Sequence, residues 1–231
     1  MRLKLPFIVF LALIIICSIS FSFTIFQIDK LENIPITGYF INPNQYLSFF
    51  PDKFNKTFST EEIEKKIEEN QQTIANLLLN GISFKHKRSM RTKGFETSTE
   101  FQKEFINYIL QPYSISSENG FYISKTSLIK VTDYIRKKVK RITEVNGILT
   151  QGEANLSFFD KLNSIDSITN EVLFEAVKDC ILNAAIKTYG NNYIFEINGY
   201  FNLVEPPLYR FSNSLIYVRI KGYVIFYSFT R

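Results

Sequence analysis

The chain is poor in the residues that build most catalytic and metal sites. It has no tryptophan, one histidine, two cysteines and nine glycines among 231 residues. Neither a His-Glu-x-x-His pattern nor a Cys-x-x-Cys pair is present, although zinc sites usually need several such ligands at defined spacings. The few glycines form no phosphate-binding loop, dinucleotide fingerprint or Gly-x-Ser-x-Gly elbow. We therefore expect a protein without enzymatic activity, cofactor or bound metal.

The two side chains with catalytic potential have ordinary alternative roles. Cys180 lies on an apolar helical stripe, which is typical of a small buried hydrophobic residue and not of a nucleophile. His86 stands inside a basic stretch, where positive neighbours disfavour its protonation and no nearby carboxylate orients it as a general base. We expect His86 on a solvent-facing loop. The sequence thus predicts no catalytic, cofactor-binding or metal-binding residue.

Charge is missing from the first part of the chain. Residues Leu5 to Phe26 include no Asp, Glu, Lys or Arg, and they follow a short head that carries Arg2 and Lys4. Such a run has the length of a membrane-spanning helix, and a basic head predicts a cytoplasmic amino terminus. The sequence therefore predicts a membrane partner through a transmembrane anchor in residues 1–26, with the rest of the chain extracytoplasmic.

Two other fates of this segment are consistent with its sequence. Leu5 to Cys17 has the length of a signal-peptide core, and small residues between 18 and 22 would allow cleavage and release of a secreted or periplasmic domain. A lipoprotein signal ending at Cys17 fits less well, because Ile16 is bulkier than the small residue normally found before the modified cysteine. The apolar residues as far as Phe26 favour a retained anchor over cleavage.

The chain after the anchor is expected to fold. Hydrophobic residues make up 45% and aromatic residues 16% of the sequence, values that exclude a disordered chain. Residues 27–58 contain three prolines and many aromatic side chains, so we expect an irregular lead-in that packs onto the domain. Residues 59–231 are expected to form one α+β extracytoplasmic domain, whose cysteine count excludes an internal disulfide.

Hydrophobic periodicity predicts about four helices in this domain. A capping box at Ser59 and a glycine at Gly190 mark the start of the first helix and the end of the last. The expected helices cover residues 60–79, 99–111, 126–145 and 169–189.

Near Tyr193 the period changes from 3.6 to 2, which predicts strands as far as Val204. A hairpin is expected from 215 to 229, turning at Lys221-Gly222. The predicted fold class is therefore α+β, with an N-terminal transmembrane helix, about four helices and a C-terminal antiparallel β-meander. In outline this resembles the extracytoplasmic subunits of cell-envelope assemblies, including components of type IV secretion systems, without a shared residue motif.

Positive charge gathers in two parts of the chain. The formal net charge is +5, yet residues 85–93 hold five basic residues and no acid, and residues 125–141 hold seven against one acid. The remainder is net acidic, most densely between Glu61 and Glu69. The predicted interaction surface consists of Lys85, Lys87, Arg88, Arg91, Lys93, Lys130, Arg136, Lys137, Lys140 and Arg141.

Such basic surfaces attract acidic proteins or anionic lipid headgroups, and they also occur as plain solvated faces. An extracytoplasmic location argues against a nucleic-acid partner. We therefore expect a non-enzymatic single-pass membrane protein whose domain mediates protein contacts in a cell-envelope assembly. The alternative is a secreted binding protein or effector that signal cleavage releases.

Overall fold

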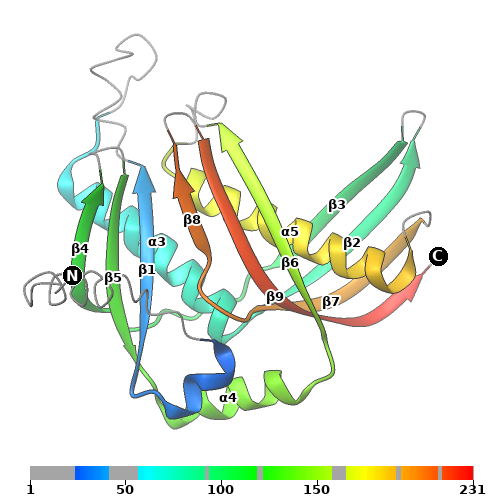
Figure 1. Cartoon of the computed structure of the whole chain (residues 1–231), viewed down its shortest axis with the longest axis horizontal. Coiled ribbons are helices and arrows are strands. Elements are labelled where there is room, and N and C mark those ends of the chain that lie inside the picture. Colours follow the sequence, from blue (N-terminus) through cyan, green and yellow to red (C-terminus); the bar gives the residue numbers. More distant parts are fainter. Residues whose placement is uncertain are drawn as a thin grey trace, which may run out of the picture.

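The computed structural model describes residues 24–41, 57–91, 94–118, 122–157, 165–190, 194–212 and 215–230. Strands predominate in this part of the chain, and three α-helices accompany them. In chain order the elements are η1 (Ile25–Lys30), β1 (Asn33–Ile41), α3 (Thr60–Leu79), β2 (Ile82–Arg91), β3 (Gly94–Gln102), β4 (Gln111–Glu118), β5 (Tyr122–Lys130), α4 (Asp133–Glu144), β6 (Ile148–Ser157), α5 (Ile168–Tyr189), β7 (Phe195–Leu203), β8 (Leu208–Phe211) and β9 (Leu215–Thr230) (Figure 1).

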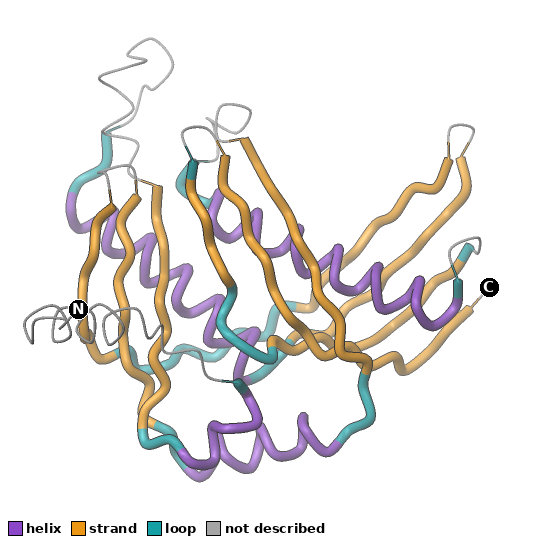
Figure 2. The backbone as a smooth tube through the Cα atoms, viewed as in Figure 1, coloured by secondary structure: helices purple, strands orange, loops and turns teal. Residues whose placement is uncertain are grey.

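Two antiparallel sheets pack against the two long helices, α3 and α5. The first sheet has the order β1-β5-β4, and the second has the order β3-β2-β7-β9-β6, with β8 also paired to β9. Helix α3 packs on β1 and α5 packs on β6, while α4 lies at one end of the molecule beside η1 (Figure 2). The apolar sides of these layers form the core.

Helix α3 sits on β1 through a glycine. A Cβ added to Gly38 would lie 2.6 Å from the carbonyl oxygen of Ile67, so only glycine lets this strand and helix approach so closely. The next backbone N–H, that of Tyr39, donates to Oδ1 of Asn70 at 2.9 Å. This joint fixes both the distance and the register between the strand and the helix.

The same joint recurs between β6 and α5. A Cβ added to Gly152 would lie 2.2 Å from the carbonyl oxygen of Ala176. The next backbone N–H, that of Glu153, donates to Oδ2 of Asp179 at 2.9 Å. Both strand–helix pairs therefore share the same three parts in equivalent places: a glycine on the strand, the backbone N–H of the next residue, and a helix side chain that accepts a hydrogen bond from that N–H.

A third contact repeats as well. Gln71 Nε2 donates to the carbonyl oxygen of Ile36 at 3.0 Å, and Cys180 Sγ lies 3.6 Å from the carbonyl oxygen of Thr150. The strands next to each helix are also paired in the same way. In the first set β5 lies between β1 and β4, and in the second set β9 pairs with both β6 and β8. We infer that the chain contains two copies of one strand–helix–strand arrangement, which the sequence analysis did not detect.

Strand β8 joins the two arrangements. The ring of Tyr209 packs 4.6 Å from that of Tyr39 on β1, centroid to centroid. Its buried hydroxyl donates to the carbonyl oxygen of Thr169 at 3.1 Å and lies 3.2 Å from Nδ2 of Asn70. Tyr209 thus contacts β1, α3 and α5 at once and holds the two sheets together.

The N-terminal prediction requires a correction. Residues 1–23, most of the predicted anchor in residues 1–26, lie outside the described residues. Ile25 belongs to the predicted span, yet it is buried in the domain core and its N–H donates to the carbonyl oxygen of Val204 at 2.6 Å. None of the helices in the described ranges is long and apolar enough to cross a membrane. The prediction that a transmembrane helix extends as far as Phe26 is therefore wrong.

The predicted irregular lead-in contains regular structure. Within residues 27–58, Asn33 to Ile41 form β1, which pairs along its whole length with β5. Pro35 is tolerated because β1 is at the edge of its sheet. Residues 42–56 lie outside the described part of the chain.

The helix predicted over residues 99–111 is wrong. Thr99 pairs with His86 and Phe101 with Phe84 in the β2–β3 hairpin, so this part of the segment is strand. Residues 103–110 then lead to β4 without helix or strand. Side-chain amides of α3 bind this segment; for example, Asn76 Nδ2 donates to the carbonyl oxygen of Ile106 at 2.8 Å. Pairing with β2 in this hairpin overrides the helical spacing of the apolar residues.

Two further elements differ from the prediction. Residues 126–130 belong to β5, and α4 begins only at Asp133, where the Thr132 hydroxyl accepts from the N–H of Ile135 at 3.3 Å. The predicted hairpin at Lys221-Gly222 is a single strand, β9. The observed fold is therefore mostly β with three α-helices in the described residues, and not a four-helix α+β domain.

Candidate functional site

The first half of the predicted basic surface is divided between the two faces of β2. Lys85 and Lys87 are exposed, whereas Arg88 is buried, because successive residues of a strand point to opposite sides. Lys85 Nζ lies 2.8 Å from Oε1 of Glu196 on the neighbouring strand β7. The side chain of Arg91 and the whole of Lys93 lie outside the described residues. These predicted residues therefore do not form one common surface.

Arg88 and His86 point into the protein together. The guanidinium carbon of Arg88 lies 4.0 Å from the ring centroid of Phe95, a cation–π contact that places the charge on an aromatic face. His86 is 1% exposed, and its Nδ1 lies 2.8 Å from the Thr99 hydroxyl on β3. Burial, with a smaller contribution from the charge of Arg88, lowers the pKa of His86 to about 4. The prediction of a solvent-facing His86 is wrong.

The second half of the predicted surface is brought together by α4. Its buried side carries Ile135, Val139 and Ile142. Lys137, Lys140 and Arg141 are exposed on the opposite side, at the three- and four-residue spacing that shares one helix face. We call these three residues the α4 basic surface. Lys130 is also exposed, at the end of β5 that leads to this helix.

Arg136 and Lys138 of α4 serve to hold the helix in place. Arg136 donates through Nη2 to the carbonyl oxygen of Leu31 at 3.0 Å and through Nη1 to that of Ile28 at 3.4 Å. Lys138 Nζ donates to Oδ1 of Asn80, the residue that caps the C-terminus of α3. Arg136 therefore does not belong to the exposed interaction surface for which it was predicted.

Substitution of Arg136 by alanine tests this structural role. We expect the free energy of unfolding to fall by about 1–3 kcal/mol, the usual range for losing hydrogen bonds to a charged group, and urea denaturation monitored by circular dichroism measures it. Lys137→Ala on the same helix is the control and is expected to change stability by less than about 0.5 kcal/mol. Equal effects of the two substitutions would contradict the assignment.

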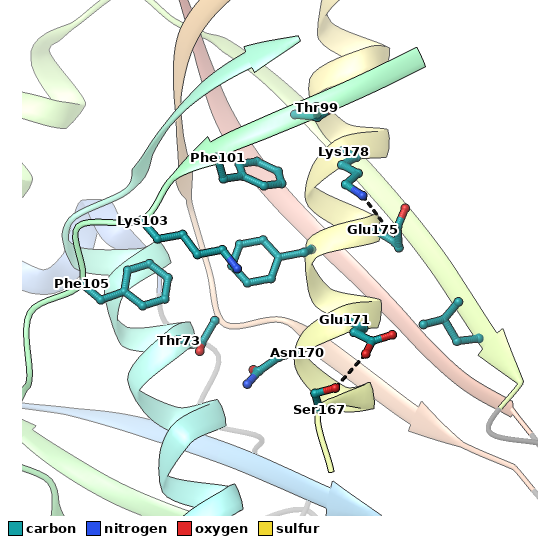
Figure 3. Close-up of a pocket in the computed structure, with 12 residues that line it drawn as sticks. Thr73, Thr99, Phe101, Lys103, Phe105, Ser167, Asn170, Glu171, Glu175 and Lys178 are labelled. Carbon is teal, nitrogen blue, oxygen red and sulfur yellow. Dashed lines mark hydrogen bonds and ion pairs between the residues drawn. The ribbon is translucent and has the colours of Figure 1, made fainter. Parts of the chain in front are cut away.

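A groove of about 590 Å³ lies between β3, its continuation and α5 (Figure 3). Phe101 and Phe174 form its apolar part with ring centroids 5.2 Å apart, and Lys103 places its ammonium group 4.1 Å from the Phe174 centroid. Its two carboxylates have local partners, since Ser167 donates to Glu171 at 2.7 Å and Lys178 lies 2.6 Å from Glu175. The lining of the groove in the described residues includes no histidine or cysteine.

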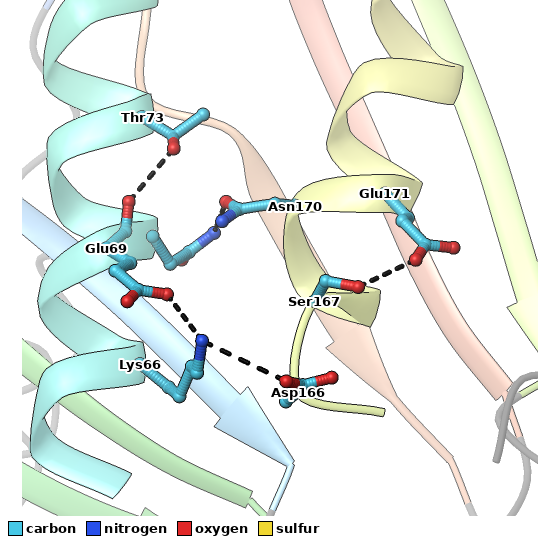
Figure 4. Close-up of polar contacts among 8 residues, drawn as sticks. Lys66, Glu69, Thr73, Asp166, Ser167, Asn170 and Glu171 are labelled. Atoms are coloured by element: carbon cyan, nitrogen blue, oxygen red, sulfur yellow. Dashed lines mark hydrogen bonds and ion pairs between the residues drawn. The ribbon is translucent and has the colours of Figure 1, made fainter. Parts of the chain in front are cut away.

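Acidic side chains gather where the N-terminal halves of α3 and α5 approach one another. Lys66 Nζ lies between two of them, 2.8 Å from Glu69 and 4.0 Å from Asp166 (Figure 4). The amide of Asn70 donates to Asn170 at 2.8 Å and links the two helices directly. We call five carboxylates of the N-terminal half of α3 and the turn before α5 the acidic surface. It consists of Glu61, Glu64, Glu68, Glu69 and Asp166, and Lys65 is exposed among them.

Neither of these features points to metal chemistry. In the described ranges, no group of three or more His, Cys, Asp or Glu residues is arranged to hold a metal ion. Burial, then the neighbouring charge of Asp179, raises the pKa of the Cys180 thiol to about 12, so its reactive thiolate is disfavoured. Comparisons of the chain with protein-family models, with curated proteins and with solved structures gave no match. The candidate functional site is therefore the α4 basic surface.

Proposed function

We propose that this protein is a non-enzymatic binding domain that presents the α4 basic surface to an acidic surface of a protein partner. One observation carries the proposal: Lys137, Lys140 and Arg141 project from the outer face of a helix whose inner face is fixed in the core. Because the backbone is held by Arg136 and by three buried aliphatic residues, binding needs little further ordering of the helix.

An apolar side chain beside the charges favours a protein partner. Tyr134 lies one turn before Lys137 and is 59% exposed. Val145 follows the helix and is 44% exposed. Protein interfaces combine such aromatic and apolar anchors with a charged rim, and tyrosine is among the residues that contribute most to them. The three-residue basic face is also short compared with the row of phosphate contacts that nucleic-acid binding usually involves.

Charge reversal on this surface tests the proposal. The triple variant K137E/K140E/R141E is expected to bind a poly-glutamate peptide about tenfold more weakly than the wild type, because three exposed ion pairs at about 0.5 kcal/mol each amount to about one tenfold step. Fluorescence anisotropy at low salt measures the affinity. Thermal melting is expected to change little, because none of the three side chains is buried.

A second triple variant separates this surface from net charge. Reversing Lys187, Arg210 and Arg219, which are also exposed, gives the same change in charge elsewhere, and we expect at most a twofold loss. Equal losses in both triples would overturn the proposal. Binding of the wild type to phosphatidylglycerol vesicles or duplex DNA, but not to the acidic peptide, would also overturn it in favour of a lipid or nucleic-acid partner.

A further inference from the structure

The basic and acidic surfaces stand at opposite ends of α3. The acidic surface begins in the first turns of this helix, at Glu61 and Glu64, whereas α4 is attached to its other end through the contact between Lys138 and Asn80 (Figure 1). Helix α3 has 20 residues, and at a rise of 1.5 Å per residue it is about 30 Å long. The molecule therefore carries opposite charges on surfaces separated by about the length of a small domain.

We propose that the acidic partner of the α4 basic surface is the acidic surface of a second copy of this chain. This inference rests on the proposed function, because it names the partner of the same site. Glu61, Glu64 and Glu68 follow one another at three- and four-residue steps and are all exposed. On α4, Lys140 and Arg141 lie three and four residues after Lys137, so each helix presents one short charged face, and these two faces of opposite charge can lie against each other.

The acidic surface already binds ammonium groups within its own chain. Lys66 lies between the carboxylates of Glu69 and Asp166, and Lys125 Nζ from β5 lies 3.7 Å from Glu64. A hydrogen bond from its own backbone N–H, then one from Ser59, lowers the pKa of Glu61, which keeps this exposed carboxylate charged. The proposed contact between copies pairs basic side chains with carboxylates, and the acidic surface already forms pairs of lysine with carboxylate within one chain.

The net charge decides how two copies approach. At +5 the copies repel each other in most orientations, whereas an approach of α4 towards the acidic surface brings opposite charges together. Because charges are screened beyond about 8 Å at physiological ionic strength, the short-range contact outweighs the overall repulsion. The two surfaces are different, so the contact is heterologous and adds copies head to tail.

Exchange of charge between the surfaces tests this inference on the full chain. The wild type is expected to self-associate in sedimentation velocity at physiological ionic strength and to dissociate in 0.5 M sodium chloride. The basic-surface variant K137E/K140E/R141E and the acidic-surface variant E61K/E64K/E68K are each expected to sediment as monomers. An equimolar mixture of the two variants is expected to associate again, because each supplies the charge that the other has reversed.

Each alternative outcome has a definite meaning. A mixture that stays monomeric, with both variants melting near the wild-type temperature, overturns the inference. If E61K/E64K/E68K unfolds, the double variant E61K/E68K repeats the test, since it keeps the ion pair between Glu64 and Lys125. A wild type that is monomeric at physiological ionic strength, but loses poly-glutamate binding when its α4 basic surface is reversed, overturns the inference and leaves the proposed function standing.

Discussion

Replacing Gly152 by alanine is expected to lower the free energy of unfolding by about 3 kcal/mol or more, the upper range for forcing atoms into a packed interior. The added Cβ would lie 2.2 Å from the carbonyl oxygen of Ala176 and 2.5 Å from the backbone nitrogen of Cys180. Both are backbone atoms of α5, so no side chain can rotate to make room. The helix has to move away from β6, which opens the core on that side.

Urea denaturation of the variant and the wild type measures this loss. Asn155→Ala is the matched control, because Asn155 is exposed on the same strand, and its effect is expected to stay within about 0.5 kcal/mol. Gly38→Ala is expected to cost a similar amount to Gly152→Ala, since its Cβ would lie 2.6 Å from the carbonyl oxygen of Ile67. A loss below about 1 kcal/mol at both glycines would show that the helices are not seated so closely on their strands.

Local signals in the sequence predicted the ends of the two long helices correctly. Ser59 accepts from the N–H of Glu62 at 3.2 Å, and the Glu62 carboxylate accepts from the Ser59 N–H at 2.9 Å, which confirms the predicted capping box. Gly190 ends α5 with φ of 90°, a conformation that suits glycine. Both signals act within a few residues, so they need no knowledge of the rest of the fold.

The strands were harder to predict because their partners are distant. Strand β2 pairs with β7, which comes more than 100 residues later in the chain; Lys85, for example, lies opposite Asn198. Its alternation was hidden, since two of the inward positions are His86 and Arg88, residues that normally mark a solvated segment. For the same reason, Arg88 was predicted on an exposed surface although it is buried.

The helical part of the predicted surface is closer to the structure. The apolar spacing of Ile135, Val139 and Ile142 indicated the buried side of α4, and that side determines which cations are exposed. Sequence could not show that Arg136 bonds to the backbone carbonyls of Ile28 and Leu31, because those residues come more than 100 positions earlier in the chain. The repeated joint at Gly38 and Gly152 was missed because it depends on the close approach of a strand backbone to a helix backbone. In the sequence, a single glycine marks each such approach.

Acid is expected to destabilise this protein through His86. Its imidazole is buried beside Arg88, and burial followed by that charge lowers its pKa from 6.5 to about 4 in the folded protein. The unfolded chain therefore binds a proton first as the pH falls. The contribution of His86 to stability is complete above pH 6.5 and is lost progressively between pH 6.5 and pH 4, by about 3 kcal/mol at most, since one pKa unit corresponds to about 1.4 kcal/mol.

Urea denaturation at several pH values between 7.5 and 4 separates this effect from that of the carboxylates. The variant His86→Gln cannot be protonated, and its amide can still reach the Thr99 hydroxyl, which lies 2.8 Å from the imidazole in the wild type. Carboxylates titrate in both proteins, so the wild type is expected to lose about 3 kcal/mol more than the variant over this range. Parallel pH profiles would mean that the imidazole is protonated without cost, and hence that β3 opens to water at His86 in the native protein.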